Sequence, residues 1–597
     1  MRALRLLARC YPWPVSVSDD LDDALERADL AGLSGEMVVR AGWAAGGLVA
    51  LLVASVAVAV GLSAPAAFSP SPVPVALAGL AAGLGTTHLV HSAPAAVTRI
   101  RRTAALGDAP DLVGRAVLRL HVEPTIEGAV AFAAATDDGP LAASLARHVR
   151  RATGRPDAGI GSFVAEWGEE FPALRRALLL VDAAAAAPPS ERVRTLDRAM
   201  TAVLHGTRER LATFAAEVQG PVTGLYAFGV LLPLALVAVL PAARVAGVPV
   251  TVGGVVLVYD VLLPAGLLVV SLWLLTRRPV AFPPPVVPRS HPDVPTGLGR
   301  AAAAGLGGAL LAGVTAVAVA PDWTVLVLTP AVGVGLALFV HSRPVAAVRD
   351  HARAVEANLV DALYLTGRRV AEGEAVESAI DHAAGEVAGA TAETFARAAH
   401  RQRQLRVGVH EAFLGEHGAL ATVPSPRTRS TAALLALAAS EGAPAGRAIV
   451  SMADHLEDLQ ALERECRHDL ARVTGSLRST ATTFAPLVGG ATVALADGMR
   501  ASGTGAAALG GGGSTGGTGT AIAGPGAPGG AELALATGSL GLAVGGYVLI
   551  LSVLLTVLAT GLEHGFDRAL LGVRVGRALP TAAVVFVAAV VLAGGVV

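Results

Sequence analysis

His91-Ser92-Ala93-Pro94, which closes an apolar run, returns 250 residues later, from position 91 to position 341, as His341-Ser342-Arg343-Pro344. The same shift, without a gap, pairs further residues of the two halves: Gly85 with Gly335, Arg99 with Arg349, Asp111 with Asp361, Arg119 with Arg369, Glu127 with Glu377, Gly139 with Gly389, Arg147 with Arg397 and Arg151 with Arg401. In both copies an apolar run leads into an arginine-rich segment with helical periodicity. The pattern predicts one unit used twice, in the order membrane hairpin, soluble helical domain, membrane hairpin.

The composition indicates a membrane protein. Of the 597 residues, 53% are hydrophobic and 16% are charged, and the mean hydropathy is +0.59, whereas soluble domains are usually about 45–50% apolar. The net charge of −1 argues against a nucleic-acid partner. The chain has no lysine, so it offers neither the lysine of a phosphate-binding P-loop nor a side-chain amine for Schiff-base chemistry.

Nine stretches are apolar enough for membrane spans of about 20 residues. They are 40–62, 72–92, 222–243, 250–275, 300–320, 323–341, 481–498, 534–560 and 578–597. The seventh is the weakest, because it is short and ends at Asp497. Arginines gather on alternate flanks, which by the positive-inside rule places the N-terminus and both long polar segments in the cytoplasm. We therefore expect a multi-pass protein of the cell membrane with an external C-terminus.

These spans define the expected domains. They are a cytoplasmic segment 1–39, membrane hairpins 40–92, 222–275, 300–341 and 481–560, cytoplasmic helical domains 93–221 and 342–480, a Pro-rich cytoplasmic linker 276–299, and a cytoplasmic turn with the final span, 561–597. Residues 502–530, rich in Gly, Ala, Ser and Thr, are expected to form a flexible external loop. An apolar stripe predicts a long helix from about Ala445 to Leu477. The expected fold class is all-α and polytopic, with two homologous cytoplasmic helical bundles.

Arginines on the helical segments are candidates for contact with an acidic protein surface. They are Arg99, Arg119, Arg147, Arg151, Arg349, Arg368, Arg369, Arg397 and Arg401. Arginine clusters are more commonly solvated helix faces, or positive-inside anchors where they lie near the membrane. The recurrence of four of them at the 250-residue shift indicates that some have a structural or binding role.

Asp260 lies inside the fourth span, where a carboxylate is costly and is a functional candidate by default. It could belong to a proton path, or it could be a buried carboxyl bonded to a neighbouring helix; no second intramembrane acid or histidine completes a relay. His88, His91 and His341 lie at inner ends of spans but lack the remaining ligands of a metal site. No catalytic motif occurs in a supporting local structure. The sequence therefore indicates no enzyme, cofactor or metal site.

This arrangement resembles the type II secretion F-domain family, the polytopic platform proteins of type IV pili, type II secretion systems and archaella. The resemblance lies in the duplicated helical domains bracketed by spans, and it covers roughly residues 75–597. Short patterns accompany it: Asn358-Leu359-Val360-Asp361-Ala362-Leu363, Arg368-Arg369-Val370-Ala371-Glu372-Gly373, Val376-Glu377-Ser378-Ala379-Ile380 and Phe228-Gly229-Val230-Leu231-Leu232-Pro233. The long double form resembles the archaeal members more than the shorter bacterial ones.

The resemblance implies a non-catalytic platform beneath a growing filament. Its cytoplasmic domains would contact a hexameric secretion ATPase, its spans would meet pilin-like subunits, and a homodimer would suit a helical filament.

A secondary transporter built on an internal repeat is the main alternative, although a transporter would place its polar groups in the membrane. An intramembrane protease, the weaker alternative, would need paired acids, or Ser and His, at membrane depth.

Overall fold

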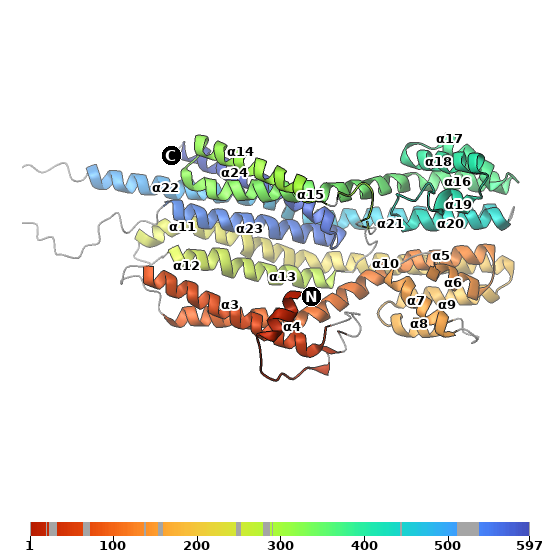
Figure 1. The fold of residues 1–597 in the computed structure, drawn as a ribbon, viewed down its shortest axis with the longest axis horizontal. Coiled ribbons are helices and arrows are strands. Elements are labelled where there is room, and N and C mark those ends of the chain that lie inside the picture. Colours follow the sequence, from red (N-terminus) through yellow and green to blue (C-terminus); the bar gives the residue numbers. More distant parts are fainter. Residues whose placement is uncertain are drawn as a thin grey trace, which may run out of the picture.

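The computed structural model shows an elongated all-helical chain (Figure 1). It describes all residues except 1, 20, 23–24, 26–32, 64–71, 136–138, 153–158, 246–251, 279–286, 289, 296, 442–444, 510–536 and 596–597. Within this described part there is no strand, which confirms the all-α expectation.

The first half begins with a short helix α1 (Arg2–Arg9) and a helical hairpin. Its elements are α3 (Gly35–Ser63), α4 (Pro72–Gly107), α5 (Ala109–Val122), α6 (Ile126–Ala135), α7 (Pro140–Ala152), α8 (Ile160–Trp167), α9 (Pro172–Ala186), α10 (Pro189–Tyr226), η2 (Ala227–Leu231), α11 (Leu232–Val245), α12 (Val252–Val256), η3 (Leu257–Leu262) and α13 (Leu263–Arg277). The segments η2 and η3 are π-helical and continue the α-helices on both sides.

The second half follows the same order. Its elements are α14 (Gly299–Val319), η4 (Asp322–Thr324), α15 (Val325–Ala357), α16 (Leu359–Ala371), α17 (Val376–Glu386), α18 (Gly389–Leu405), α19 (Val409–Leu414), α20 (Pro426–Glu441), α21 (Ala445–Ser479), η5 (Thr480–Phe484), α22 (Ala485–Leu509) and α23 (Thr537–His564). The 250-residue shift carries the first residue of α5 to the first residue of α16, and the first residue of α6 to the first residue of α17. The ends of these helices then differ by one residue. A final helix, α24 (Arg568–Gly594), follows this second set.

Among the described residues, seven helices are long and apolar enough to cross a membrane. They overlap the third to ninth expected spans: Pro189–Val237, Gly253–Arg277, Gly299–Val319, Asp322–Ala371, Gly446–Gly498, Gly538–His564 and Arg568–Gly594. The first two expected spans, 40–62 and 72–92, lie within the helices α3 and α4. These candidate spans indicate a multi-pass membrane protein.

Two helical domains lie at one end of the molecule, and the C-terminal end of α24 lies at the other (Figure 1). The first domain, α5–α9 with the start of α10, packs around a core that includes Leu112, Phe163 and Met200. The second, α16–α20 with the start of α21, packs around a core that includes Leu363 and Phe413. The long helix α15 runs from the second domain into the apolar layer, and α10 and α21 continue into it through the π-helical turns η2 and η5 (Figure 1).

Two helix ends can be compared directly with the sequence patterns. The helix expected from about Ala445 to Leu477 is confirmed as α21, Ala445–Ser479. The expected external loop 502–530 was placed too early, because α22 continues to Leu509. Alanine at positions 501 and 506–508 favours continued helix despite the intervening glycines. Residues 510–530 lie outside the described part.

Each π-helical segment ends two residues before a proline: η2 before Pro233, η3 before Pro264 and η5 before Pro486. A proline inside a helix has no N–H to donate to the carbonyl four residues earlier, and its ring collides with that carbonyl. Widening the preceding turn to π geometry relieves the collision and lets the helix continue. Two of the three, η2 and η5, lie where the long domain helices α10 and α21 pass into apolar helices.

Helices α15 and α24 approach each other through glycine. A Cβ atom on Gly576 would lie 2.6 Å from the Phe339 nitrogen and 2.8 Å from the Gly335 carbonyl oxygen. These are backbone atoms, which cannot swing away as a side chain could. Small residues allow such close approach between membrane helices, where dispersion contacts stabilise the pair.

We predict that Gly576→Ala destabilises the protein by about 1–3 kcal/mol, because the added methyl overpacks a backbone contact. Gly594→Ala is the matched control: it lies in the same helix and meets no atom within 4 Å. We expect it to be neutral, or stabilising by up to about 1 kcal/mol through helix propensity. Thermal unfolding of both variants in the same detergent measures the difference; equal midpoints would contradict the proposed close packing.

Candidate functional site

Five of the nine candidate arginines have no ion pair or side-chain hydrogen bond to any residue that the structure describes. They are Arg99 on α4, Arg147 and Arg151 on α7, Arg368 on α16 and Arg401 on α18. All except the half-buried Arg401 are exposed. Their charges are therefore available to a partner.

The other four arginines are engaged within the chain. Arg119 pairs with Glu123, and Arg369 pairs with Glu374 at 3.5 Å and Glu386 at 2.8 Å. Arg397 donates to the Thr394 hydroxyl at 3.2 Å. Arg349 pairs with Asp567 at the start of α24, and both side chains are largely buried. Arg349 thus holds two helices together, a structural role that its position near the membrane did not indicate.

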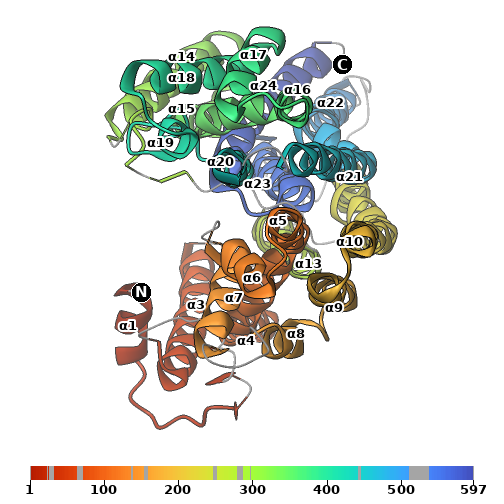
Figure 2. The same ribbon diagram turned by 90° about the vertical axis from the view of Figure 1, so that its right-hand side faces the viewer.

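Four of the nine candidate arginines lie on two matched helices, α7 and α18. Arg147 and Arg151 are one turn apart on α7, and their partners at the 250-residue shift, Arg397 and Arg401, are one turn apart on α18. Residues four apart share one face of a helix. Each domain therefore has two arginines on one helix face, on α7 in the first domain and on α18 in the second; Figure 2 shows the positions of these two helices.

The two domains exchange apolar side chains. Leu118 of α5 lies in the core of the second domain, and Leu459 of α21 lies in the core of the first. Both side chains are largely buried, with exposed fractions of 7% and 5%. Figure 2, viewed from the domain end, shows α5 beside α20 and α21, where this exchange occurs. Burying a leucine stabilises by about 1.5–3 kcal/mol, so the domains form a continuous body.

A cluster of ion pairs lies at the same interface between the two domains. Arg427 of α20 reaches Glu463 of α21 at 2.8 Å and Asp111 of α5 at 3.5 Å. The Ser425 hydroxyl donates to Glu356 beside them. Burial by itself would lower the pKa of Arg427, but the carboxylates of Asp111, Glu463 and Glu356 outweigh it and raise that pKa. Arg427 is therefore a largely buried cation that joins the two domains.

Two histidines face each other nearby, on opposite sides of the interface. His121 Nδ1 lies 2.9 Å from the Val117 carbonyl oxygen, so Nδ1 carries the proton in the neutral ring and Nε2 is the base. His455 Nε2 lies 4.0 Å from Asp197 Oδ1. His121 Nε2 and His455 Nδ1 are buried without a partner in the described part. Burial lowers the pKa of both histidines below 6.5.

The turn between α23 and α24 is a second polar cluster, at the domain side of the apolar layer. Glu563 accepts hydrogen bonds from Thr474 and Arg478, both near the end of α21, and from Arg574 at 2.8 Å. The Glu563 side chain is only 4% exposed. A buried carboxylate needs such donors, because an unpaired one is strongly destabilising.

The same turn also binds the first half and α15. Arg278, which follows α13, donates from Nε to the Leu562 carbonyl oxygen at 2.6 Å and from a terminal nitrogen to that of Glu563 at 3.1 Å. Asp567 caps α24 by accepting from the backbone nitrogens of Ala569 and Leu570, and it pairs with Arg349. The turn 563–567, which we call the α23–α24 turn, thus joins helices α13, α15, α21 and α24.

Asp260 lies in η3, inside the apolar layer. Its Oδ1 is buried without a partner in the described part and would lie 3.0 Å from a Cβ atom on Gly546 of α23. Gly546 therefore leaves the space that the carboxyl occupies. The hydrogen bond to a neighbouring helix that would make Asp260 purely structural is not seen for this oxygen.

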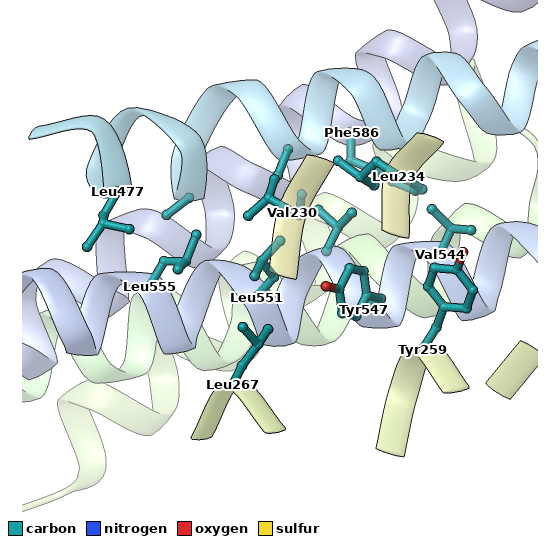
Figure 3. Close-up of a cluster of buried hydrophobic side chains, with 14 of the residues drawn as sticks. Val230, Leu234, Tyr259, Leu267, Leu477, Val544, Tyr547, Leu551, Leu555 and Phe586 are labelled. Atoms are coloured by element: carbon teal, nitrogen blue, oxygen red, sulfur yellow. The ribbon is translucent and has the colours of Figure 1, made fainter. Parts of the chain in front are cut away.

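Two tyrosines beside Asp260 donate to backbone carbonyls around Pro233. Pro233 cannot donate to the Gly229 carbonyl, and the Tyr547 hydroxyl donates to it instead. The Tyr259 hydroxyl donates to the Pro233 carbonyl oxygen at 2.8 Å. The two rings meet edge to face with centroids 5.6 Å apart, within the apolar cluster of Figure 3. The widened turn η2 of the first half is therefore held by α23 of the second.

Sequence reasoning missed Arg427, Glu563, Asp567 and Tyr547. Each acts through a partner far away in the chain, so no local pattern marks it. One signal was present: an acid at Glu563 and another at Asp567 bracket the end of an apolar helix otherwise flanked by arginines.

No group of three or more His, Cys, Asp or Glu side chains suited to a metal ion occurs within the described ranges. Comparison of the chain with protein-family models, curated proteins and solved structures gives no match.

We predict that Arg427→Gln destabilises the protein by about 3–5 kcal/mol, because it leaves the Asp111 carboxylate at the interface without the cation that it pairs with and leaves Glu463 with Arg467 alone. The matched control is Arg353→Gln, which removes an exposed pair with Asp350 and should cost less than about 1 kcal/mol. Chemical denaturation of both variants measures the two losses. Similar losses would show that Arg427 contributes no more than a surface pair.

We also predict that acidification weakens the contact between the domains. Because the pKa values of His121 and His455 are lower in the packed state than the unfolded value of 6.5, the packed state favours neutral rings. The stabilisation is complete above pH 6.5 and is lost as the pH falls through the folded-state pKa values.

The double variant His121→Gln/His455→Gln should therefore lose less stability than the wild type between about pH 7.5 and about pH 5.5. His400→Gln, at an exposed position on α18, is the control and should keep the wild-type dependence. Thermal unfolding at the two pH values tests this. An unchanged pH dependence in the double variant would show that these rings do not titrate on packing.

Proposed function

We propose that this chain is a non-catalytic membrane platform of a type IV pilus-like machine, in which it couples a cytoplasmic secretion ATPase to the assembly of pilin-like subunits into a surface filament. In this proposal the protein lies in the cell membrane, with its N-terminus and both helical domains in the cytoplasm and its C-terminus outside. Nine spans would cross the bilayer, and the two halves would be homologous.

One observation carries the proposal. Two helical domains with matching helix order lie at one end, and long helices continue from each into the apolar layer. A helix transmits displacement along its axis because every turn is hydrogen-bonded to the next. Domains joined in this way suit the transfer of force from a soluble motor to membrane helices.

The polar clusters support the same reading. Leu118, Leu459 and Arg427 join the two domains, so a push on either reaches both. The α23–α24 turn then binds α21, α15 and the end of α13. Motion of the domains would therefore act on several apolar helices together.

The basic faces of α7 and α18 are the proposed contacts with the ATPase. Because the two faces are equivalent, they suit a partner that presents the same acidic surface more than once, as a ring of identical subunits does. Arg99 and Arg368 are additional contacts in this proposal. Arg349, paired with Asp567, acts in the scaffold.

The experiment is photo-crosslinking in native membranes. Amine-reactive reagents are unsuitable, since the chain has no lysine. A photoreactive residue at Ala143 of α7 or Glu393 of α18, both exposed and each four residues before an arginine of the basic face, probes these faces, and one at Leu179 of α9 is the control. Crosslinks to a secretion ATPase from the first two positions alone would support the platform. Crosslinks only to the chain itself would contradict the platform proposal and favour the transporter. Asp260 would then be the first residue to mutate.

We predict that reversing the four charges, Arg147→Glu, Arg151→Glu, Arg397→Glu and Arg401→Glu, weakens ATPase binding by about 10-fold or more, since each exposed pair contributes about 0.2–1 kcal/mol. The control Arg175→Glu/Arg176→Glu reverses two exposed charges on α9 that have no arginine at the 250-residue shift. Co-purification of the ATPase with each variant measures the effect. Wild-type recovery with the quadruple variant would exclude these faces.

A further inference from the structure

Two cations from different helices lie against one aromatic ring. The guanidinium carbon of Arg343, on α15, is 5.4 Å from the centroid of Phe339, and that of Arg577, on α24, is 5.1 Å from it. Both arginines are exposed. A guanidinium over a ring face is held by the ring quadrupole, so the two charges are fixed near one point of the surface.

These charges have no counter-charge. Neither arginine has an ion pair with a carboxylate within the described part of the chain, whereas their neighbours Arg574 and Arg349 pair with Glu563 and Asp567. Two like charges at one ring repel each other, and an anion placed between them removes that repulsion. The guanidinium fork binds phosphate oxygens in a bidentate manner.

The position selects a membrane-borne anion. Arg343 follows the expected span 323–341, and Arg577 precedes the span 578–597, so both lie at the domain-side boundary of the apolar layer. Arg577 begins an exposed stripe on α24 that continues through Thr581, Val584, Ala588 and Leu592 at helical spacing. Val584 and Leu592 are 54% and 71% exposed. A phosphate at the arginines would thus have an apolar track for its attached chain.

We propose that Arg343 and Arg577 form a binding site for the phosphate of an anionic phospholipid in the cytoplasmic leaflet, with an acyl chain along the exposed stripe of α24. Basic pockets between membrane helices bind lipid headgroups in this way. The site depends on membrane insertion and on the orientation of the chain, but not on the platform function. It would anchor the α15–α24 pair, whose other polar link is Arg349 with Asp567.

The test measures binding of phosphatidylglycerol to the delipidated full-length protein in detergent by native mass spectrometry. A basic residue near the membrane contributes about 1 kcal/mol to anionic-lipid binding, so Arg343→Gln and Arg577→Gln should each weaken it about 5-fold and the double variant about 30-fold. Arg277→Gln, which removes a lone cation 4.3 Å from the Trp273 ring centroid, is the control and should change binding by less than about 2-fold.

The remaining arms distinguish the sources of the anion. Phosphatidylcholine should bind much more weakly than phosphatidylglycerol, and inorganic phosphate should not displace the lipid. If the double glutamine variant fails to fold, Arg343→Lys/Arg577→Lys keeps both charges and should bind with intermediate affinity, because lysine lacks the bidentate fork. Unchanged binding in either double variant, an equal loss in Arg277→Gln, equal binding of phosphatidylcholine, or displacement by inorganic phosphate would each overturn the proposal.

Discussion

The buried carboxylate of Glu563 is the constraint on which the arrangement of the apolar helices depends. At the domain-side boundary of that layer, a carboxylate with 4% exposed area needs donors from its surroundings. Those donors come from α21 and α24, while Arg278 binds the carbonyl of the same residue. Helices from both halves are therefore fixed at one turn. A displacement of α21 along its axis must carry this turn with it or break charge-assisted hydrogen bonds.

A second link between the two halves depends on Pro233 in the apolar layer. In a bilayer each unsatisfied carbonyl is costly, so a proline within a membrane helix requires a substitute donor. Tyr547 supplies it to Gly229, across the boundary between the two halves. The widened turns η2 and η5 lie where the domain helices α10 and α21 enter the apolar layer. The helices thus stay continuous at the positions where their hydrogen-bond ladders are weakest, which makes these turns the places where bending costs least.

The sequence predicted what depends on local periodicity. The stripe from Ile449 to Leu477 predicted the end of α21 to within two residues, because its apolar positions are buried at helical spacing, although they enter three different cores. It did not predict Arg427 with Asp111, whose pairing joins positions 316 residues apart, nor Glu563 with Thr474. Such pairs depend on which helices pack together, and periodicity records only that a face is buried. For the same reason the sequence predicted the same contact role for Arg147 and Arg349, although of these two only Arg349 has an ion pair within the described part of the chain, with Asp567.

The repeat therefore has unequal consequences in its two copies. Arg99 and Arg349 are equivalent at the 250-residue shift, yet Arg349 pairs with Asp567 at the start of α24, and the first half contributes no such helix after α13. Arg99 is left exposed on α4. Helices α3 and α4 pack mainly against each other, beside the remaining apolar helices (Figures 1 and 2). The second half, closed by α24, is thus the more heavily linked scaffold. Since α7 and α18 keep the same basic face while their supports differ, symmetry is retained where an outside partner would bind and is relaxed where the chain binds itself.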